Sequence, residues 1–298
     1  MAEVATWPRL AAALSAATGL HLASEPDRSV GGGSINECRR WPSREGPLFV
    51  KLGPAGRLPM FEAEAEGLRE LRQAGRLRVP RVLGHGAVEQ RAFLALEWID
   101  FGSASTRSET LLGEGLAAQH RVTAPDFGWH RDNTIGSTPQ RNTRDQDWVR
   151  FYVDHRLGCQ LELAAVNGYR GRLTERGALL RERTAFFFEQ YRPVPSLLHG
   201  DLWAGNWAAD ASGNPVIFDP AVYFGDREAD LAMTRLFGGF GPAFYAAYDS
   251  CWPLEPGARE RRTLYNLYHV LNHLNLFGGN YLSQAQAMID RLLSVAGS

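Results

Sequence analysis

The first hundred residues combine short apolar runs with helical patterns of hydrophobic and polar positions. Leu48–Leu52 is a short apolar run typical of a strand, and residues 79–87 and 92–99 predict two further strands. Apolar residues recur at helical spacing over residues 6–18, and residues 59–74 are rich in Glu, Leu and Arg, which favour a helix. This order predicts a small β-rich unit.

A change to Gly and Ser over residues 101–108 predicts a boundary between two lobes. Beyond it the pattern is mostly helical, with helices expected over residues 109–121, 147–166, 173–191, 230–237, 242–248, 259–277 and 283–295. Short strand-and-loop segments are expected over residues 196–206 and 216–220. The chain is therefore expected to be an α+β protein, with a β-rich lobe over residues 1–100 and a larger helical lobe over residues 101–298.

Composition narrows the class of protein. The 298 residues are 44% hydrophobic and 22% charged with a net charge of −1, which is ordinary globular composition without a basic nucleic-acid surface. No apolar stretch approaches the ~18 residues of a membrane helix, and the first residues lack the pattern of a secretory leader. Three widely spaced cysteines, Cys38, Cys159 and Cys251, suit reduced thiols. We expect a cytoplasmic monomer or homodimer without nucleic-acid or membrane partners.

The strongest motif is His199-Gly-Asp201-Leu-Trp-Ala-Gly-Asn206, followed by Ile217-Phe-Asp219-Pro. In protein kinases, a catalytic-loop aspartate accepts the proton of the substrate hydroxyl, while an asparagine five residues later and a further aspartate hold magnesium. Asp201 is therefore the predicted base, and Asn206 and Asp219 are predicted to hold Mg²⁺, which prefers oxygen ligands. A turn and a strand end use the same residue types, but two such segments in register favour a kinase that uses ATP.

All but one of the 32 basic residues are arginine, and the exception is Lys51 on the predicted strand. A kinase lysine at such a place pairs the α- and β-phosphates of ATP and is held by a helix glutamate. Glu62, Glu64 and Glu66 lie on the next predicted helix. Chance survival of a surface lysine is the alternative interpretation.

A glycine-rich segment precedes this lysine and supplies the candidate phosphate cover. Its predicted ATP-contacting residues are Gly31, Gly32, Gly33, Ser34 and Asn36. Glycines allow backbone N–H groups to approach phosphate oxygens, although such triplets are also common in plain loops.

The last strand of the first lobe ends at Glu97-Trp98-Ile99. In a kinase-like fold this is the hinge, whose backbone binds adenine. The end of a core strand would have the same pattern.

These residues also resemble one family. The catalytic motif and Val216-Ile-Phe-Asp-Pro-Ala221 are similar to those of the fructosamine kinase (ketosamine 3-kinase) family, as are Phe127-Gly-Trp-His-Arg-Asp-Asn133 and Leu236-Phe-Gly-Gly-Phe240. Met60-Phe-Glu-Ala-Glu64 resembles the family's lysine-pairing helix, which favours Glu64 as the partner of Lys51. The resemblance extends over nearly the whole chain.

The resemblance implies a two-lobe protein-kinase-like fold related to aminoglycoside phosphotransferases. It implies ATP-dependent phosphorylation of the sugar 3-hydroxyl of ketosamines, such as ribulosamine or fructosamine adducts on small amines or proteins. The unstable 3-phosphate is then eliminated, which regenerates the amine and amounts to deglycation. Many members carry a cysteine where this chain has Ser34. An intersubunit disulfide through that position is therefore not available here, and Cys38 is an alternative redox thiol or an inert one.

Substrate contacts are assigned to polar residues outside the catalytic motif. The candidates are His130, Asp132, Asn133, Asp226 and Glu228. Residues 127–142 are expected either to contact nucleotide or sugar or to pack between the lobes. Asp230 is expected to be structural, and His199 to brace the catalytic loop.

Two rival functions share the motifs. A phosphotransferase for an aminoglycoside, choline or another amino alcohol would use the same Lys51, Asp201, Asn206 and Asp219. A non-catalytic pseudokinase that binds nucleotide is the rival of another class. The complete set of four residues argues against it.

Overall fold

The computed structural model describes residues 7–31 and 36–297. Its contacts divide the chain into two compact units. The N-terminal unit comprises Met1–Ser108 and Trp207–Pro220, and the C-terminal unit comprises Glu109–Asn206 and Ala221–Ser298. Trp207–Pro220 therefore packs with the N-terminal unit, although a division of the sequence at residue 100 assigns it to the helical lobe.

The N-terminal unit is built around an antiparallel sheet with the strand order β1-β2-β3-β5-β4. A second, three-stranded sheet has the order β11-β10-β6, so the late segment joins the first unit by strand pairing. The elements are α1 (Trp7–Thr18), β1 (Arg28–Ser29), β2 (Glu37–Trp41), β3 (Leu48–Pro54), the 3₁₀ turn η1 (Ala55–Arg57), α2 (Leu58–Ala74), β4 (Val82–Val88), β5 (Arg91–Glu97), β6 (Phe101–Gly102), β10 (Trp207–Asp210) and β11 (Pro215–Ile217).

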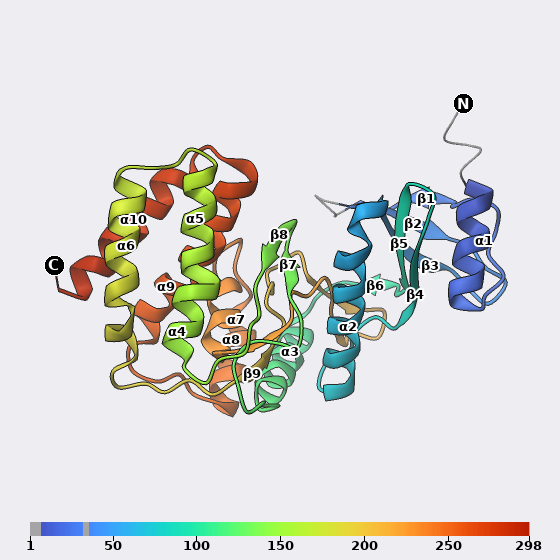
Figure 1. The fold of residues 1–298 in the computed structure, drawn as a ribbon. Helices are drawn as coiled ribbons and strands as arrows, with labels where there is room; N and C mark the ends of the chain where they lie inside the picture. Colours follow the sequence, from blue (N-terminus) through green and yellow to red (C-terminus); the bar gives the residue numbers. More distant parts are fainter. Residues whose placement is uncertain (1–6, 32–35, 298) are drawn as a thin grey trace. The chain divides into compact units, whose positions relative to one another are not determined.

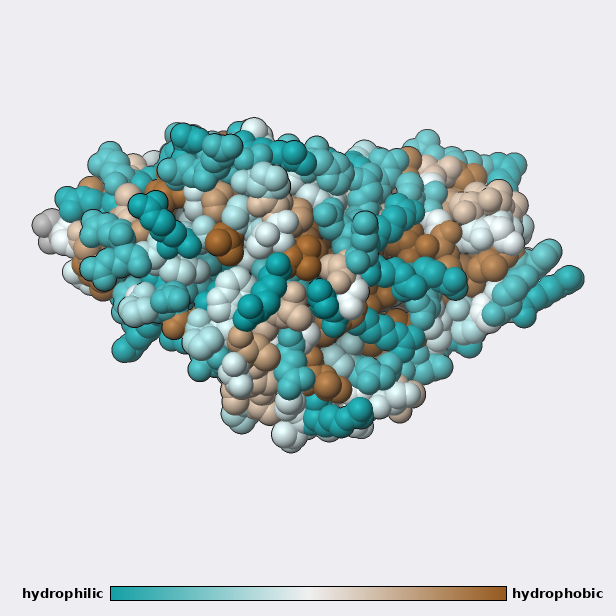
Figure 2. Space-filling model, turned by 90° about the horizontal axis from the view of Figure 1, so that it is seen from below, coloured by the Kyte–Doolittle hydropathy of each residue, from teal (hydrophilic) through white to brown (hydrophobic). Residues whose placement is uncertain are grey.

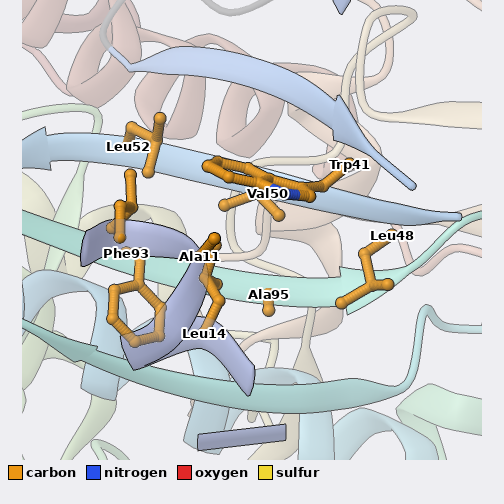
Figure 3. Close-up of a cluster of buried hydrophobic side chains, with 9 residues drawn as sticks. Ala11, Leu14, Trp41, Leu48, Val50, Leu52, Phe93 and Ala95 are labelled. Atoms are coloured by element: carbon orange, nitrogen blue, oxygen red, sulfur yellow. The ribbon is translucent and has the colours of Figure 1, made fainter. Parts of the chain in front are cut away.

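The two faces of the five-stranded sheet carry different side chains. Leu48, Val50 and Leu52 of β3 belong to the buried cluster formed with α1, which Figure 3 shows together with Trp41 and Phe93. Because side chains alternate along a strand, Lys51 projects from the opposite face. In Figure 1, α1 and α2 lie on opposite sides of the sheet, so Lys51 lies on the α2 side.

The C-terminal unit is mostly helical. Its strands form two antiparallel pairs, β7 with β8 and β9 with β12. The elements are α3 (Thr106–His120), whose first turn belongs to the N-terminal unit, β7 (Asn133–Ile135), β8 (Thr138–Gln140), α4 (Trp148–Tyr152), the π-helical turn η2 (Val153–Gly158), α5 (Cys159–Val166), α6 (Arg172–Arg183), the 3₁₀ turn η3 (Thr184–Phe188), β9 (Ser196–Leu198), β12 (Tyr223–Gly225), α7 (Arg227–Met233), α8 (Pro242–Cys251), α9 (Ala258–Phe277) and α10 (Tyr281–Val295).

Helix α9 forms the centre of this unit. It contacts α5, α7 and α10, and α5, α6, α9 and α10 lie side by side in Figure 1. Every residue from Leu264 to Asn272 is buried, as expected for a helix that is surrounded by neighbours. This packing supports α7, which carries two carboxylates described below.

Most predicted helices agree with the structure. The helices expected over residues 6–18 and 259–277 are confirmed as α1 and α9. The helix expected over residues 230–237 was wrong in its limits, because α7 runs from Arg227 to Met233. The side chain of Asp226 accepts a hydrogen bond from the N–H of Glu228 and so caps the helix three residues earlier than expected.

The surface drawn in Figure 2 is mainly hydrophilic, with hydrophobic residues scattered over it. Across residues 7–31 and 36–297, none of the helices has the length and apolar character that a membrane crossing requires.

Candidate active site

The loop that carries Asp201 follows the buried strand β9 and depends on a glycine. Gly200 has a φ of +84°, and a Cβ there would lie 2.0 Å from the backbone oxygen of Ala221. Any other residue would therefore combine an unfavourable backbone conformation with a collision. The N–H of Ala221 in turn donates to the backbone oxygen of His199 at 2.8 Å. The two segments are therefore held backbone to backbone.

Asp230 on α7 holds the same loop through its carboxylate. Its Oδ2 accepts the N–H of His199 at 2.7 Å, and its Oδ1 accepts the N–H of Gly200 at 2.8 Å. The ring of His120 lies 3.1 Å from Oδ2. Burial alone would raise the pKa of Asp230, but the hydrogen bond and charge of His120 and the loop N–H outweigh it and lower the pKa. A buried carboxylate anion therefore fixes the loop.

His199 is fully buried, and its Nδ1 lies 3.3 Å from the N–H of Asp201, which places it as an acceptor inside the loop. This agrees with its expected bracing role.

Asp201 and Asn206 lie together in the C-terminal unit. The side-chain nitrogen of Asn206 donates to the backbone oxygen of Asp201 at 2.8 Å and to its Oδ2 at 3.2 Å. The Asp201 carboxylate is half-buried, and Asn206 is buried. Because the nitrogen is the donor within the loop, the oxygen of Asn206 is the atom suited to ligate a cation. The five-residue spacing thus closes a short turn.

Lys51 lies between two carboxylates in the N-terminal unit. Its Nζ is 2.6 Å from Glu64 Oε1 on α2 and 2.6 Å from Asp219 Oδ1. Burial lowers the pKa of the ammonium, but the charges of Asp219 and Glu64 outweigh it and raise the pKa of Lys51. Lys51 therefore stays protonated, and Glu64 is the glutamate of α2 that contacts it.

Asp219 has an uncommon backbone conformation. Its φ is +58°, in the left-handed region that residues other than glycine rarely adopt. The next residue is Pro220, which further restricts the backbone before it. Backbone strain of this kind concentrates at functional sites. The Asp219 side chain is 40% exposed, in contrast to 9% for Glu64, so Asp219 is the better placed of the two to reach a bound ion.

The hinge candidates end β5 and form polar contacts of their own. Glu97 accepts hydrogen bonds from Arg78 at 3.0 Å and from the N–H of Arg81 at 3.1 Å. The indole N–H of Trp98 donates to Asp100 at 2.8 Å, and Ile99 is buried. The side chains of Glu97 and Trp98 are therefore engaged within the unit, and the backbone N–H of Glu97 also donates to the backbone oxygen of Arg81 at 2.8 Å.

The predicted phosphate cover is described only at its two ends. Gly32, Gly33 and Ser34 lie outside the described residues. Gly31 is exposed and Asn36 is half-buried, with Asn36 Oδ1 accepting a hydrogen bond from Arg57 at 2.7 Å.

Cys38, just beyond this segment, is buried, and burial raises the pKa of its thiol to about 11. A thiol that stays protonated at neutral pH is a poor nucleophile, so the structure favours the inert interpretation.

The substrate candidates in and just before β7 differ in their exposure to solvent. His130 and Asp132 are exposed, whereas Asn133 is buried. Asn133 donates to the backbone oxygen of Val222 at 2.8 Å, and its Oδ1 accepts from Gln140 at 2.9 Å. Asn133 therefore connects β7 to the segment that follows the catalytic loop, in a structural position.

Asp226 and Glu228 are both engaged with protein partners inside the C-terminal unit. The hydroxyls of Tyr191 and Tyr265 donate to Asp226 at 2.8 and 2.5 Å, and Arg261 forms a bidentate pair with Glu228 at 2.8 Å. Both side chains are buried. Burial raises the pKa of Asp226, and it raises the pKa of Glu228 to about 7. The geometry therefore does not support the expected substrate contacts and places both carboxylates in the support of α7.

The sequence analysis assigned no role to two residues of interest. Arg57 contacts Asn36 at the edge of the sheet, and no local pattern distinguishes it from the other arginines. Arg156 is fully buried in the π-helical turn, 4.0 Å from the centre of the Tyr223 ring, and donates to Asn142 at 2.7 Å. The position of Arg156 among apolar residues of a predicted helix is the only feature of the sequence that indicates its burial.

Oxygen donors are the groups available for a metal ion. Within residues 7–31 and 36–297, no three or more His, Cys, Asp and Glu side chains gather in a metal-binding arrangement. The amide oxygen of Asn206 in the C-terminal unit and the carboxylate of Asp219 in the N-terminal unit are each oxygen donors of the kind that Mg²⁺ prefers. Each residue therefore fits Mg²⁺ by its own chemistry.

Comparisons with solved structures define the class. The fold matches an aminoglycoside phosphotransferase with a TM-score of 0.63 at 13% identity, covering 100% of both chains, which shows a shared fold. It matches the crystal structure of a protein assigned as a fructosamine-3-kinase from Haemophilus somnus with a TM-score of 0.86 at 29% identity, covering 95% of this chain and 96% of that one. The protein therefore has the α+β, protein-kinase-like fold of the small-molecule phosphotransferases, as predicted.

Sequence relatives define the family. A model of the fructosamine kinase family matches residues 6–295. A probable ketoamine kinase of Synechocystis sp. is 44% identical over 292 residues, covering 98% of each chain. A chloroplastic protein-ribulosamine 3-kinase of Arabidopsis thaliana is 44% identical over 272 residues, covering 89% of this chain and 82% of the relative. The chain belongs to the fructosamine kinase family, and it is an ATP-dependent phosphotransferase that acts on a hydroxyl group.

Proposed function

We propose that this enzyme transfers the γ-phosphoryl group of ATP to the sugar 3-hydroxyl of a ketosamine, a ribulosamine or fructosamine adduct on a small amine or a protein. The observation that carries the proposal is the Asp201–Asn206 pair on a loop held by the buried Asp230 carboxylate. Membership of the family supplies the acceptor class. Elimination of the 3-phosphate then frees the amine, so the biological result is deglycation.

Asp201 is the proposed base. It accepts the proton of the 3-hydroxyl as the oxygen attacks the γ-phosphorus, and ADP leaves with the electron pair of the broken P–O bond. The proton then passes from Asp201 to solvent, so the carboxylate is restored. Since Asp230 fixes the backbone on the N-terminal side of Asp201 and Asn206 donates to its carboxylate, the base is held in one place before the acceptor arrives.

Residues 1–100, together with the segment 207–220 that packs with them, form the proposed ATP-binding lobe, and the rest of residues 101–298 forms the proposed catalytic and substrate-binding lobe. Backbone groups of Glu97, Trp98 and Ile99 bind adenine in this proposal. The phosphates lie on Lys51, which Glu64 orients. The glycine-rich segment that covers them consists of the residues named above, Gly31, Gly32, Gly33, Ser34 and Asn36.

Mg²⁺ is the proposed metal, with Asn206 and Asp219 as its protein ligands. When bound with ATP it neutralises the charge of the phosphates. Asp219 has a left-handed backbone, and its carboxylate also accepts a hydrogen bond from Lys51 at 2.6 Å. Asp219 thus serves both the lysine and the metal.

His130 and Asp132 are the proposed contacts to the acceptor, because both are exposed in the segment that the family resemblance singles out. Asn133, Asp226 and Glu228 act through the segments they hold. Free ketosamines and glycated proteins are the proposed partners, and the cytoplasm is the proposed location, which the three unpaired cysteines support.

The test is ATP consumption with Mg²⁺ against a ribulosamine, a fructosamine and an aminoglycoside. Asp201→Asn is the control, because it keeps the shape of the side chain and removes the base. Turnover on a ketosamine that falls by at least about 100-fold in the variant is the expected result. Formation of the 3-phosphate and release of the amine are followed by phosphorus NMR and an amine assay.

Turnover confined to the aminoglycoside would assign the chain to the resistance-type phosphotransferases. Binding of ATP without turnover on any of the three acceptors would favour a pseudokinase. Equal turnover by the wild type and Asp201→Asn would contradict the role of Asp201.

A further inference from the structure

We propose that Arg57 is a second phosphate-binding cation of the N-terminal unit and that Asn36 fixes its direction, an inference that rests on the proposed ATP site. Three observations within that unit point to it. They concern the face of the sheet, the position of Gly53 and the balance of charge around Lys51.

The face of the sheet follows from the strand register. Leu52 pairs with Glu37 across β2 and β3, and Lys51 pairs with Cys38. Leu52 belongs to the cluster under α1, so Lys51 and the residue two places on, Gly53, project from the other face. Asn36 comes directly before β2, whose first residue pairs with Leu52. Lys51 and Gly53 therefore share one face of β3, and Asn36 contacts Arg57, whose stem passes over Gly53.

Gly53 provides the space that Arg57 occupies. A Cβ at residue 53 would lie 2.9 Å from Cδ of Arg57 and 3.6 Å from its Cβ. The stem of Arg57 therefore lies across the bare backbone of β3, and its guanidinium donates to Asn36 Oδ1 at 2.7 Å. Arg57 itself follows β3 in the turn η1, and this path brings its charge back over the strand that carries Lys51.

The balance of charge explains why a second cation is needed. Lys51 contacts both Glu64 and Asp219 at 2.6 Å, so the group of three carries one positive and two negative charges. A polyphosphate that approaches Lys51 meets a cation whose charge is already compensated. Arginine offers a planar fork of N–H donors that matches phosphate oxygens, so Arg57 can bind phosphate while it keeps its bond to Asn36.

The experiment measures affinity rather than turnover. Dissociation constants for adenosine, AMP, ADP and ATP are determined by calorimetry for the wild type and Arg57→Gln. In Arg57→Gln the affinity for ATP should fall about tenfold or more, while the affinity for adenosine should be unchanged. The shortest nucleotide whose affinity falls identifies the phosphate that Arg57 contacts. Arg69→Gln is the matched control, an exposed arginine of the helix α2 that follows Arg57, and should leave all four values unchanged.

A second variant tests the geometry. Gly53→Ala adds the Cβ that displaces Arg57 without placing strain on the backbone, because Gly53 has no positive φ. Gly53→Ala should lower the affinity for ATP, as Arg57→Gln does. The double variant should bind ATP no more weakly than Arg57→Gln alone. If Arg57→Gln does not fold, Gly53→Ala and Arg57→Lys provide the same comparison, with thermal unfolding as the check of the fold.

An equal loss of affinity for adenosine and ATP would mean that Arg57 only connects the residue before β2 to the turn before α2. That result would overturn the inference. Unchanged affinity for all four ligands would overturn it as well. These results leave ATP binding by the wild type intact, so they do not touch the proposed function. A wild type that binds no adenine nucleotide would instead overturn the ATP site and this inference with it.

Discussion

Asp230 and Gly200, thirty residues apart in the chain, are joined by a hydrogen bond of 2.8 Å from the Gly200 N–H to the Asp230 carboxylate. The next residue after Gly200 is Asp201, so a helix carboxylate determines where the proposed base lies. The same carboxylate accepts the N–H of His199 and faces the ring of His120.

Asp230→Asn should lower both stability and turnover. The amide has one acceptor oxygen where the carboxylate has two, and the lost charge weakens the remaining bonds, so the free energy of unfolding should fall by about 1.5–3 kcal/mol. The value of kcat should fall, because the loop held by Asp230 carries the proposed base. Urea unfolding and steady-state kinetics measure the two effects.

The exposed variant Asp249→Asn is the control for Asp230→Asn and should change neither quantity. A stability loss without any change in kcat would contradict the positioning role of Asp230.

Gly200→Ala should be among the most destabilising substitutions in the chain. Its cost has two parts, the left-handed backbone, about 1–2 kcal/mol, and the collision with the Ala221 oxygen. Gly168→Ala separates them, because Gly168 has a φ of +94° but a Cβ added there would have nothing within 4 Å. We expect Gly168→Ala to show only the first part in urea unfolding. Equal losses for the two variants would argue against the close approach of Gly200 to Ala221.

Lys51 and Glu64 should be strongly coupled. Lys51→Met leaves two carboxylates next to each other, one of them buried, and should cost about 3–5 kcal/mol of stability. Glu64→Gln should cost less, because Lys51 keeps Asp219. The double variant should be less destabilised than the sum of the single variants, with a coupling energy of about 0.5–3 kcal/mol. Strict additivity in denaturant unfolding would show that the pair contributes nothing as a pair.

Glu228 should make the free energy of unfolding depend on pH between about 4.5 and about 7. Burial raises its pKa to about 7, from an ordinary value of 4.5, although Arg261 opposes the shift. Between these values the folded chain holds a proton that the unfolded chain has lost. Stability should therefore fall as pH rises from about 4.5 to about 7, by at most about 1.4 kcal/mol per pH unit.

Glu228→Gln should reduce this slope without abolishing it, because burial raises the pKa of Asp226 as well. The exposed variant Glu25→Gln is the control and should keep the wild-type slope. Urea unfolding at pH values from about 4.5 to about 7.5 gives the comparison, and an unchanged slope in Glu228→Gln would rule out this source of pH dependence.

Part of the fold and site could be predicted because it depends on local spacing. Helices α1 and α9 follow from periodic apolar residues, and the Asp201–Asn206 contact follows from a five-residue turn. The limits of α7 could not be predicted, because its capping residue Asp226 is itself fixed by Tyr191 and Tyr265 from distant parts of the chain.

The sequence by itself determined the class of protein and the residue types of its chemistry. The reason is that each of its two signals, the single lysine on a predicted strand and the motif around Asp201, is contained in a short segment of the chain. Only the tertiary structure decided that Asp226 and Glu228 are buried supports, that residues 207–220 pair with the first unit, and that Arg57 lies across Gly53. The physical reason is that burial and charge compensation depend on contacts between residues far apart in the chain, which local patterns do not specify.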